Sequence, residues 1–156
     1  MTTNAVLCYI RDGGRVLLQH KAEGRFGGGF WNAPGGKIVD CESPEQAAVR
    51  EIHEETGLAV SDLRDVGTIT FYLDGIEEPD IYVYVFVAGR FEGTLRANDE
   101  GPIEWITEEA LLYDQMWEDD RLWVPHLLAG RRIRGSFRFS EHYGRLLTHQ
   151  VEVLPA

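Results

Sequence analysis

The chain has little cysteine, little positive charge and no long apolar run. Its only two cysteines are Cys8 and Cys41, which excludes a disulfide framework and favours a reduced, cytoplasmic protein. Fifteen Lys and Arg residues face 26 Asp and Glu residues, and a net charge of −11 disfavours duplex nucleic acid or an anionic membrane as a partner. No stretch reads as a signal peptide or a membrane span.

A chain of 156 residues can bury a core of its own, and no linker composition interrupts it, so we expect a single domain over residues 1–156. Helical and strand patterns alternate, which predicts the α/β class with a mixed β-sheet and helices on its two faces. The expected strands are 5–10 and 16–18 as a hairpin around a turn at 12–14, then 66–73, 81–91, 131–139 and 146–153. The sequence gives no indication of an oligomeric state.

Three shorter features complete the predicted organisation. A short helix is expected over 108–113, with Thr107 as its cap, and a last helix is expected from Asp119 or Asp120 to Ala129. The glycine-rich stretch 24–29 lacks the lysine and serine or threonine that end a phosphate-binding loop, and no helix follows it. We interpret this stretch as a lip of the fold.

Acidic residues cluster in one short segment. Glu51, Glu54 and Glu55 are separated by three and four positions, so on a helix their carboxylates project from one face. Three like charges at that spacing repel each other, and a hard divalent cation with oxygen ligands would hold them together. Mg²⁺ is the expected cofactor because it joins carboxylates to substrate phosphates, and Mn²⁺ could substitute for it.

The helix that carries these acids has clear end signals. Ser43 is the expected N-cap, Pro44 the first helical residue, Gln46 the partner in a capping box, and Gly57 the C-terminal stop. Arg50 is close enough to orient a carboxylate without occupying the metal face. The arc expected to pack on the core consists of Ala48, Val49, Ile52 and Thr56.

A lone pattern of this kind would more often be a solvated amphipathic helix, but the whole segment carries more information. It matches the Nudix box, G-x5-E-x7-R-E-U-x-E-E-x-G-U, at every specified position. The matching residues are Gly36, Glu42, Arg50, Glu51, Ile52, Glu54, Glu55, Gly57 and Leu58. The chain therefore resembles a Nudix hydrolase.

This resemblance implies a Nudix-type α/β/α sandwich and a set of roles. Glu51, Glu54 and Glu55 would bind the metal together with the backbone carbonyl of Gly35, and Glu42 and Arg50 would support them. A further acid often joins the metal site in this family, and Glu100 is the best candidate, although an acidic pair in a loop is otherwise a polar turn.

A second resemblance extends nearly end to end, to the animal oxidised-purine nucleoside triphosphatases of the MutT-homologue group. It implies a nucleotide pocket, for which Gly36 and Lys37 at the start of the box are also candidates. The residues that match positions in the pocket or beside the metal are Lys21, Phe26, Asn32, Phe71, Glu100, Trp117, Asp119 and Asp120. Val6 and the pair Ala33-Pro34 depart from those enzymes next to the base pocket, which bears on the choice of base.

The chemistry of the pocket candidates is also consistent with binding a base. Trp117 offers a flat face for stacking, and Asn32 has a two-sided amide. Adjacent carboxyls at Asp119 and Asp120 can accept a hydrogen bond or, when protonated, donate one. Trp117 could instead be a packing residue, as we expect of Trp31, Trp105 and Trp123, and the acid pair could be a helix cap.

The sequence therefore predicts Mg²⁺-dependent hydrolysis of purine nucleoside triphosphates, including oxidised ones such as 8-oxo-dGTP, to the monophosphate and pyrophosphate. The partner would be a small-molecule nucleotide substrate. An alternative is a Nudix hydrolase of another nucleoside diphosphate derivative, such as a dinucleoside polyphosphate or ADP-ribose. A catalytically silent nucleotide sensor is a third reading, which the intact Glu51, Glu54 and Glu55 disfavour.

Overall fold

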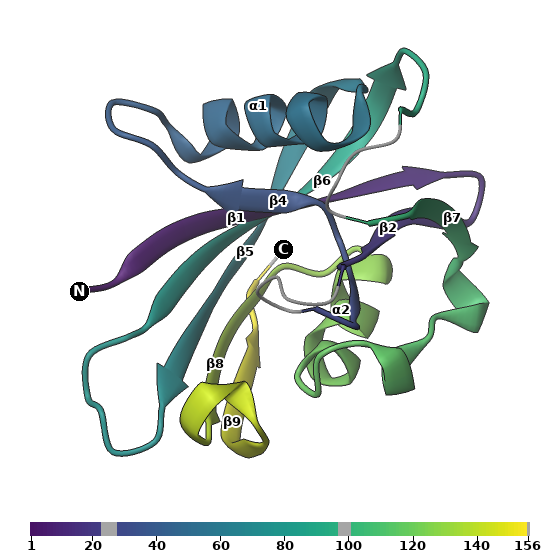
Figure 1. Cartoon of the computed structure of the whole chain (residues 1–156). Helices are drawn as coiled ribbons and strands as arrows, with labels where there is room; N and C mark the ends of the chain where they lie inside the picture. Colours follow the sequence, from purple (N-terminus) through teal and green to yellow (C-terminus); the bar gives the residue numbers. More distant parts are fainter. Residues whose placement is uncertain (23–27, 97–100, 156) are drawn as a thin grey trace.

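The computed structural model describes residues 1–22, 28–96 and 101–155, in which nine strands form one mixed sheet (Figure 1). The strands are β1 Thr3–Asp12, β2 Arg15–His20, β3 Trp31–Asn32, β4 Gly35–Lys37, β5 Ala59–Leu73, β6 Ile81–Glu92, β7 Ile103–Thr107, β8 Ile133–Phe139 and β9 Leu146–Val153. The α-helices are α1 Pro44–Thr56 and α2 Asp120–Leu128. The 3₁₀ turns are η1 Glu108–Ala110, η2 Tyr113–Gln115 and η3 Glu141–Tyr143.

The sheet combines parallel and antiparallel pairs. Its order is β3-β2-β1-β6-β5-β8-β9, with β4 paired to β1 and β7 paired to β2. The pairs β1 with β6 and β5 with β8 are parallel, and the remaining pairs are antiparallel. The predicted N-terminal hairpin is confirmed, with Arg11 opposite Val16.

A hydrophobic core lies on each face of the sheet, because successive strand residues point to opposite sides. Cys8 and Ile10 of β1 pack with Ile52 of α1, whereas Tyr9 between them packs with Trp123 of α2. Both cores include fully buried side chains. This arrangement confirms the expected α/β/α sandwich. None of the helices in the described part of the chain has the length and apolar character to cross a membrane.

Helix α1 begins and ends where its sequence signals predict. The Gln46 backbone N–H donates to Ser43 Oγ over 3.1 Å, and the Ser43 N–H donates to Gln46 Oε1 over 2.9 Å, which completes the capping box. Gly57 closes the helix with φ 83°, in the left-handed region that glycine adopts without cost. The helix that carries the acidic residues is therefore fixed at both ends.

Several sequence predictions need correction. Ala47 is buried where Val49 was expected, and Val49 is 38% exposed, because α1 lies on the sheet through its small residues. The helix over 108–113 is replaced by η1 and η2, separated by non-helical Leu111 and Leu112, which pack against the core. Thr107 makes no side-chain cap.

Two strand boundaries also differ from expectation. β5 starts at Ala59 rather than residue 66, because it follows the α1 cap almost directly and pairs with β6 from its first residue. A bulge between Asp65 and Gly67 then shifts the register, which splits the hydrophobic pattern of one long strand into two parts. β8 starts at Ile133, two residues later than expected.

The bulge provides a test of the fold. Gly67 has φ 123°, and a Cβ atom there would collide with the carbonyl oxygen of Ile133 on β8. We expect Gly67→Ala to lower the free energy of unfolding by at least about 2 kcal/mol. Gly89→Ala on β6 is the matched control, because its nearest neighbour is the Asp62 carbonyl oxygen at 3.9 Å. Equal urea unfolding midpoints for the two variants would contradict this account of the bulge.

Candidate active site

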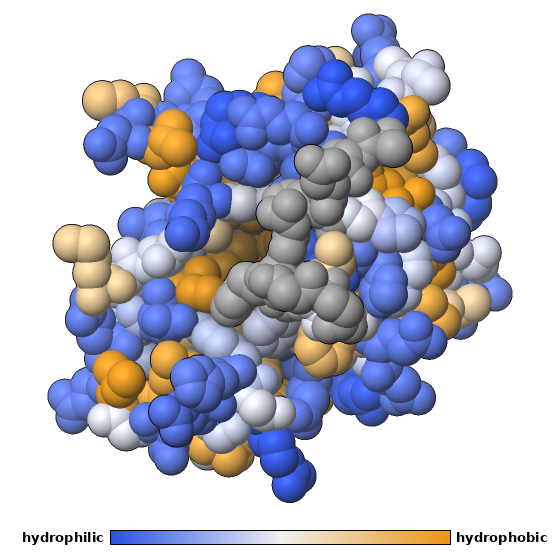
Figure 2. Space-filling view, viewed as in Figure 1, coloured by the Kyte–Doolittle hydropathy of each residue, from blue (hydrophilic) through white to orange (hydrophobic). Residues whose placement is uncertain are grey.

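A cleft of about 460 Å³ is lined by residues of β1, β4, β5 and β6, and also by Trp117, the first residues of α2 and Tyr143 of η3. Figure 2 shows an apolar hollow at the centre of this face, below the polar surface of α1. The cleft gathers most of the predicted substrate residues from positions far apart in the chain. Those that line it are Lys21, Asn32, Gly35, Gly36, Lys37, Phe71, Trp117, Asp119 and Asp120. The predicted residues Phe26 and Glu100 lie outside the described residues.

Arg50 organises the acidic end of the site. Its Nε and Nη2 donate to the two oxygens of Glu42 over 2.6 and 2.9 Å, and its Nη1 donates to Glu51 over 2.8 Å. Weaker contacts reach Glu54 at 3.3 Å and the Lys37 carbonyl oxygen at 3.0 Å. The hydrogen bonds from Arg50 lower the pKa of Glu42, and Glu42 and Glu51 raise the pKa of Arg50. The predicted orienting role of Arg50 is therefore visible as direct contacts.

Two glycines let the carboxylates approach the backbone of β4. A Cβ atom at Gly36 would lie 2.5 Å from the carboxylate carbon of Glu51. The Gly35 N–H donates to Glu55 Oε2 over 3.2 Å, and a Cβ atom at Gly35 would collide with the carbonyl oxygen of Val6. Side chains at these two positions would therefore push β4 away from β1 and α1.

The donor chemistry fits a hard divalent cation. Glu55 is buried, and its carboxylate lies beside two residues that line the cleft, with Lys21 Nζ 3.9 Å from its Oε1 and the Gly35 N–H donating to its Oε2. Glu51 and Glu54 are turned toward Arg50. Across residues 1–22, 28–96 and 101–155, no three acidic, histidine or cysteine side chains already stand close enough to enclose a metal ion.

The far wall of the cleft carries two buried acids. Asp119 and Asp120 are 1% and 3% exposed, and Trp123 Nε1 donates to Asp119 Oδ2 over 2.8 Å. Asp119 Oδ1 and Asp120 Oδ2 are buried without a hydrogen-bond partner among the described residues. Asp119 occupies the N-cap position of α2, but its side chain makes no cap hydrogen bond, so the capping interpretation is wrong for this residue.

Burial changes the protonation of this pair. Desolvation raises the pKa of Asp119 to about 6, partly offset by the Trp123 hydrogen bond. The pKa of Asp120 is raised well above its ordinary value by burial and then by the charge of Asp119. Burial therefore favours the protonated form of both carboxyls, and the charge of Asp119 adds to this effect at Asp120.

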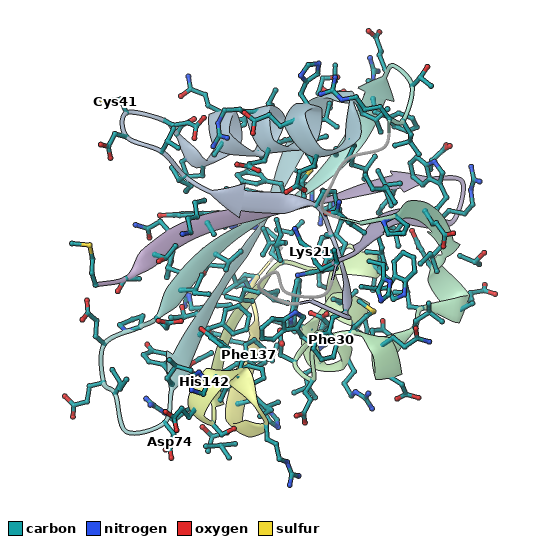
Figure 3. The ribbon with its side chains drawn as sticks, viewed as in Figure 1. Lys21, Phe30, Cys41, Asp74, Phe137 and His142 are labelled. Carbon is teal, nitrogen blue, oxygen red and sulfur yellow. The ribbon has the colours of Figure 1, made fainter. Side chains whose placement is uncertain are left out.

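Aromatic side chains form the lower part of the cleft. Trp117 is half-buried, with ring centroids 5.9 Å from Phe30 and 5.2 Å from Tyr143. In Figure 3, Phe30 is labelled below Lys21, farther from α1. Asn32 Oδ1 accepts from the Ala33 N–H over 2.9 Å.

Three tryptophans expected to be packing residues behave differently from one another. Trp31 stacks on His20 with centroids 4.9 Å apart, and Trp105 packs on Phe91 at 5.4 Å, as expected. Trp123 is fully buried but also lines the cleft and holds Asp119, a role that sequence reasoning missed. The i, i+4 spacing of Asp119 and Trp123 on α2 was the available signal.

Tyr143 is the second functional residue that was missed, and it lines the cleft beside Trp117. It comes from η3, a turn between two strands, and no motif surrounds it in the sequence. Only the fold brings this turn to the cleft.

Comparison with known proteins places this geometry in a family. A family model described as the NUDIX domain matches residues 1–127. The chain belongs to the Nudix hydrolase family. The acidic segment of α1 is therefore the Nudix box in its folded form, and members of this family generally use divalent metal cations.

Curated relatives and solved structures agree with this assignment. The Nudix chain is 43% identical over 136 residues to an oxidized purine nucleoside triphosphate hydrolase of Danio rerio, covering 87% of this chain and 86% of that protein. It is 38% identical to the Mus musculus protein of the same name, covering 81% and 80%. A crystal structure of a MutT protein from Bacillus halodurans has a TM-score of 0.84 at 28% identity, with 96% and 97% of the two chains covered.

The buried acid pair gives a stability prediction. A carboxyl whose pKa is raised by folding keeps its proton in the folded chain while the unfolded chain loses it, so stability falls as pH rises from about 4 to about 6. Asp120→Asn removes one such group, so it reduces this fall and raises the free energy of unfolding at pH 7.

Urea unfolding from pH 4 to pH 7 measures the effect of Asp120→Asn. Asp114→Asn is the matched control, because Asp114 is a nearby exposed acid paired with Arg121. An unchanged pH dependence in Asp120→Asn would show that the pair titrates normally in the folded chain.

Proposed function

We propose that this protein is a Mg²⁺-dependent diphosphatase of purine nucleoside triphosphates, including oxidised forms such as 8-oxo-dGTP, and that it serves nucleotide-pool sanitation. The products are the nucleoside monophosphate and pyrophosphate. The observation that carries the proposal is a single cleft whose lining includes Gly35 and Gly36, which adjoin the Nudix carboxylates of Glu55 and Glu51, and also the buried acid pair beside Trp117. The names of the two relatives at 43% and 38% identity support the same substrate class.

The phosphate end would hold the metal and the triphosphate. Glu51, Glu54 and Glu55, with the Gly35 carbonyl, would hold Mg²⁺, and Glu100 is the further predicted acid. When bound, Mg²⁺ would supply positive charge to neutralise the phosphates and would lower the pKa of a bound water.

Side chains of the chain itself prepare this end. Arg50 fixes the directions of Glu42 and Glu51 through charge-assisted hydrogen bonds. Lys21 and Lys37 line the cleft on the same side and place positive charge near the expected phosphates. Gly35 and Gly36 have no side chains, so β4 lies close to Val6 of β1 and to Glu51 of α1, and the backbone of β4 stays accessible to the expected phosphates.

The other end of the cleft would recognise the purine by aromatic stacking and by hydrogen bonds from the acid pair. Trp117 supplies an aromatic face in the cleft, and its neighbour Phe30 extends that face. Protonated Asp120 can donate to the base edge while ionised Asp119 accepts from it. Two buried oxygens without partners, Asp119 Oδ1 and Asp120 Oδ2, would gain them from the base.

The apolar part of the cleft lining limits which residues can distinguish one purine from another. Val6, at 1% exposure, and Ala33, at 2%, both line the cleft without a polar group in their side chains. Discrimination by hydrogen bonds therefore rests on Asp119, Asp120 and Asn32. A panel of nucleotides that also contains dinucleoside polyphosphates and ADP-ribose tests the substrate class through the Mg²⁺-dependent formation of nucleoside monophosphate.

The first test removes a metal ligand. Glu51→Gln or Glu54→Gln takes one carboxylate charge from the site with almost no change in volume, and we expect turnover of 8-oxo-dGTP to fall by at least about 100-fold. Glu45→Gln in the first turn of α1 is the control, because Glu45 is exposed and outside the box residues. Near-parental turnover in both test variants at saturating Mg²⁺ would refute the catalytic assignment.

The second test concerns base discrimination. Asp119→Asn and Asp120→Asn each fix a donor and an acceptor and remove the titration, so the ratio of kcat/KM for 8-oxo-dGTP over dGTP should change about tenfold or more. The Mg²⁺ dependence should stay close to that of the parent enzyme. If both variants keep the parental ratio from pH 5 to pH 8, the acid pair does not read the base.

A further inference from the structure

Tyr143 enters the cleft from an unusual turn. It is the last residue of η3, which connects β8 to β9, and its ring lies 5.2 Å from Trp117 and 5.3 Å from Phe139. Its contact with Trp117 is edge to face, with an interplanar angle of 78°. Tyr143 therefore supports the same aromatic face that is available for stacking on a base.

The backbone of this turn is strained. His142 and Tyr143 have φ values of 58° and 57°, a left-handed conformation that is uncommon for one bulky residue and more so for two in succession. The side chain of His142 is 90% exposed, and its contact with Glu141, with Nε2 3.5 Å from Oε1, is equally exposed to solvent. The conformation directs the next side chain, Tyr143, into the cleft.

One hydrogen bond fixes the Tyr143 ring. Its hydroxyl donates to Asp80 Oδ2 over 2.5 Å, and Asp80 lies in the turn between β5 and β6. Burial and the Asp80 interaction both raise the pKa of Tyr143, so the phenol stays a hydrogen-bond donor throughout the physiological range. The Asp80 backbone is held separately, since its N–H donates to the Phe71 carbonyl over 2.8 Å. The bond therefore ties η3 to the turn between β5 and β6, whose backbone is itself hydrogen-bonded to β5.

The position of Tyr143 defines which part of a ligand it meets. η3 and the 74–80 turn, marked by His142 and Asp74 in Figure 3, lie at the end of the molecule opposite α1. Phe71 and Ile81, which flank the 74–80 turn, line the cleft with Tyr143. Trp117 contacts Tyr143 on this side, so the wall that they form is remote from the carboxylates that would bind phosphate.

We propose that Tyr143 is a specificity-determining residue: tied to Asp80, its ring closes the outer end of the base pocket and holds Trp117 at the spacing that a planar purine requires. The proposal rests on the proposed function, because it assigns the base to this end of the cleft. A purine fills the space between the acid pair and this wall, whereas a pyrimidine, with one ring fewer, leaves part of it open. Tyr143 acts through Trp117 and through shape, and the hydrolytic carboxylates are independent of it.

The experiment compares three substitutions. Tyr143→Ala removes the wall, Tyr143→Phe keeps the ring but loses the hydroxyl, and Asp80→Ala removes the acceptor. KM and kcat are measured for a purine and a pyrimidine nucleoside triphosphate, together with competitive inhibition by inorganic triphosphate. Tyr72→Phe is the matched control, because Tyr72 is a half-buried tyrosine of β5 next to Phe71 and does not line the cleft.

We expect Tyr143→Ala to raise KM for the purine nucleotide about tenfold while kcat stays within about twofold. Inhibition by triphosphate should not change, because that ligand has no base. Tyr143→Phe and Asp80→Ala should each raise KM about threefold, and the double variant should be no worse than either, since both remove one hydrogen bond. A merely structural role would instead lower the thermal midpoint and weaken all three ligands alike.

Two failures are distinguishable. If the parent enzyme hydrolyses no purine nucleoside triphosphate, the proposed function fails, and the same variants are then compared on the best nucleotide of the panel. If the parent enzyme is active on purines but Tyr143→Ala keeps the parental ratio of kcat/KM for purine over pyrimidine, the inference about Tyr143 is overturned. Additive effects of Tyr143→Phe and Asp80→Ala would overturn the role of their hydrogen bond.

Discussion

Arg50 holds together carboxylates that would otherwise repel each other, and the acidic end of the cleft depends on it. One guanidinium serves Glu42 in the loop before α1, Glu51 and Glu54 on the helix, and the Lys37 carbonyl on β4. Its planar array of donors matches this fan of oxygens, which a lysine could not do. The loop, the helix and the strand are therefore joined at one charged group.

The sheet separates the two tasks of the site. One hydrophobic core fixes α1 to its face of the sheet, and the other fixes α2 and its acid pair to the opposite face. The cleft opens where β4 leaves the main sheet to pair only with β1. The acids proposed to bind the metal and the acids proposed to read the base consequently lie on separately packed helices, so one set can change without unfolding the other.

The ends of α1 could be predicted because they depend on residues close together in the sequence. Features that depend on contacts between distant residues could not be predicted in this way. Ser43, Gln46 and Gly57 act on neighbours a few residues away, so the helix ends follow from the sequence. The face of α1 that packs on the sheet depends on tertiary fit, which is why Ala47 is buried in place of Val49. Tyr143 reaches the cleft only because β8 pairs with β5, and Leu111 and Leu112 leave the helix for the core for a similar non-local reason.

The buried acids carry a lesson about how such an enzyme can evolve. Asp119 and Asp120 are held in an apolar wall with two oxygens that the described residues leave without hydrogen bonds. Such groups cost stability in the empty enzyme, so random mutation followed by selection for heat resistance alone would tend to discard them. Under the proposed function, base recognition is the benefit that offsets this cost, and the tolerance of the rest of the fold to destabilising mutation is smaller by the same amount.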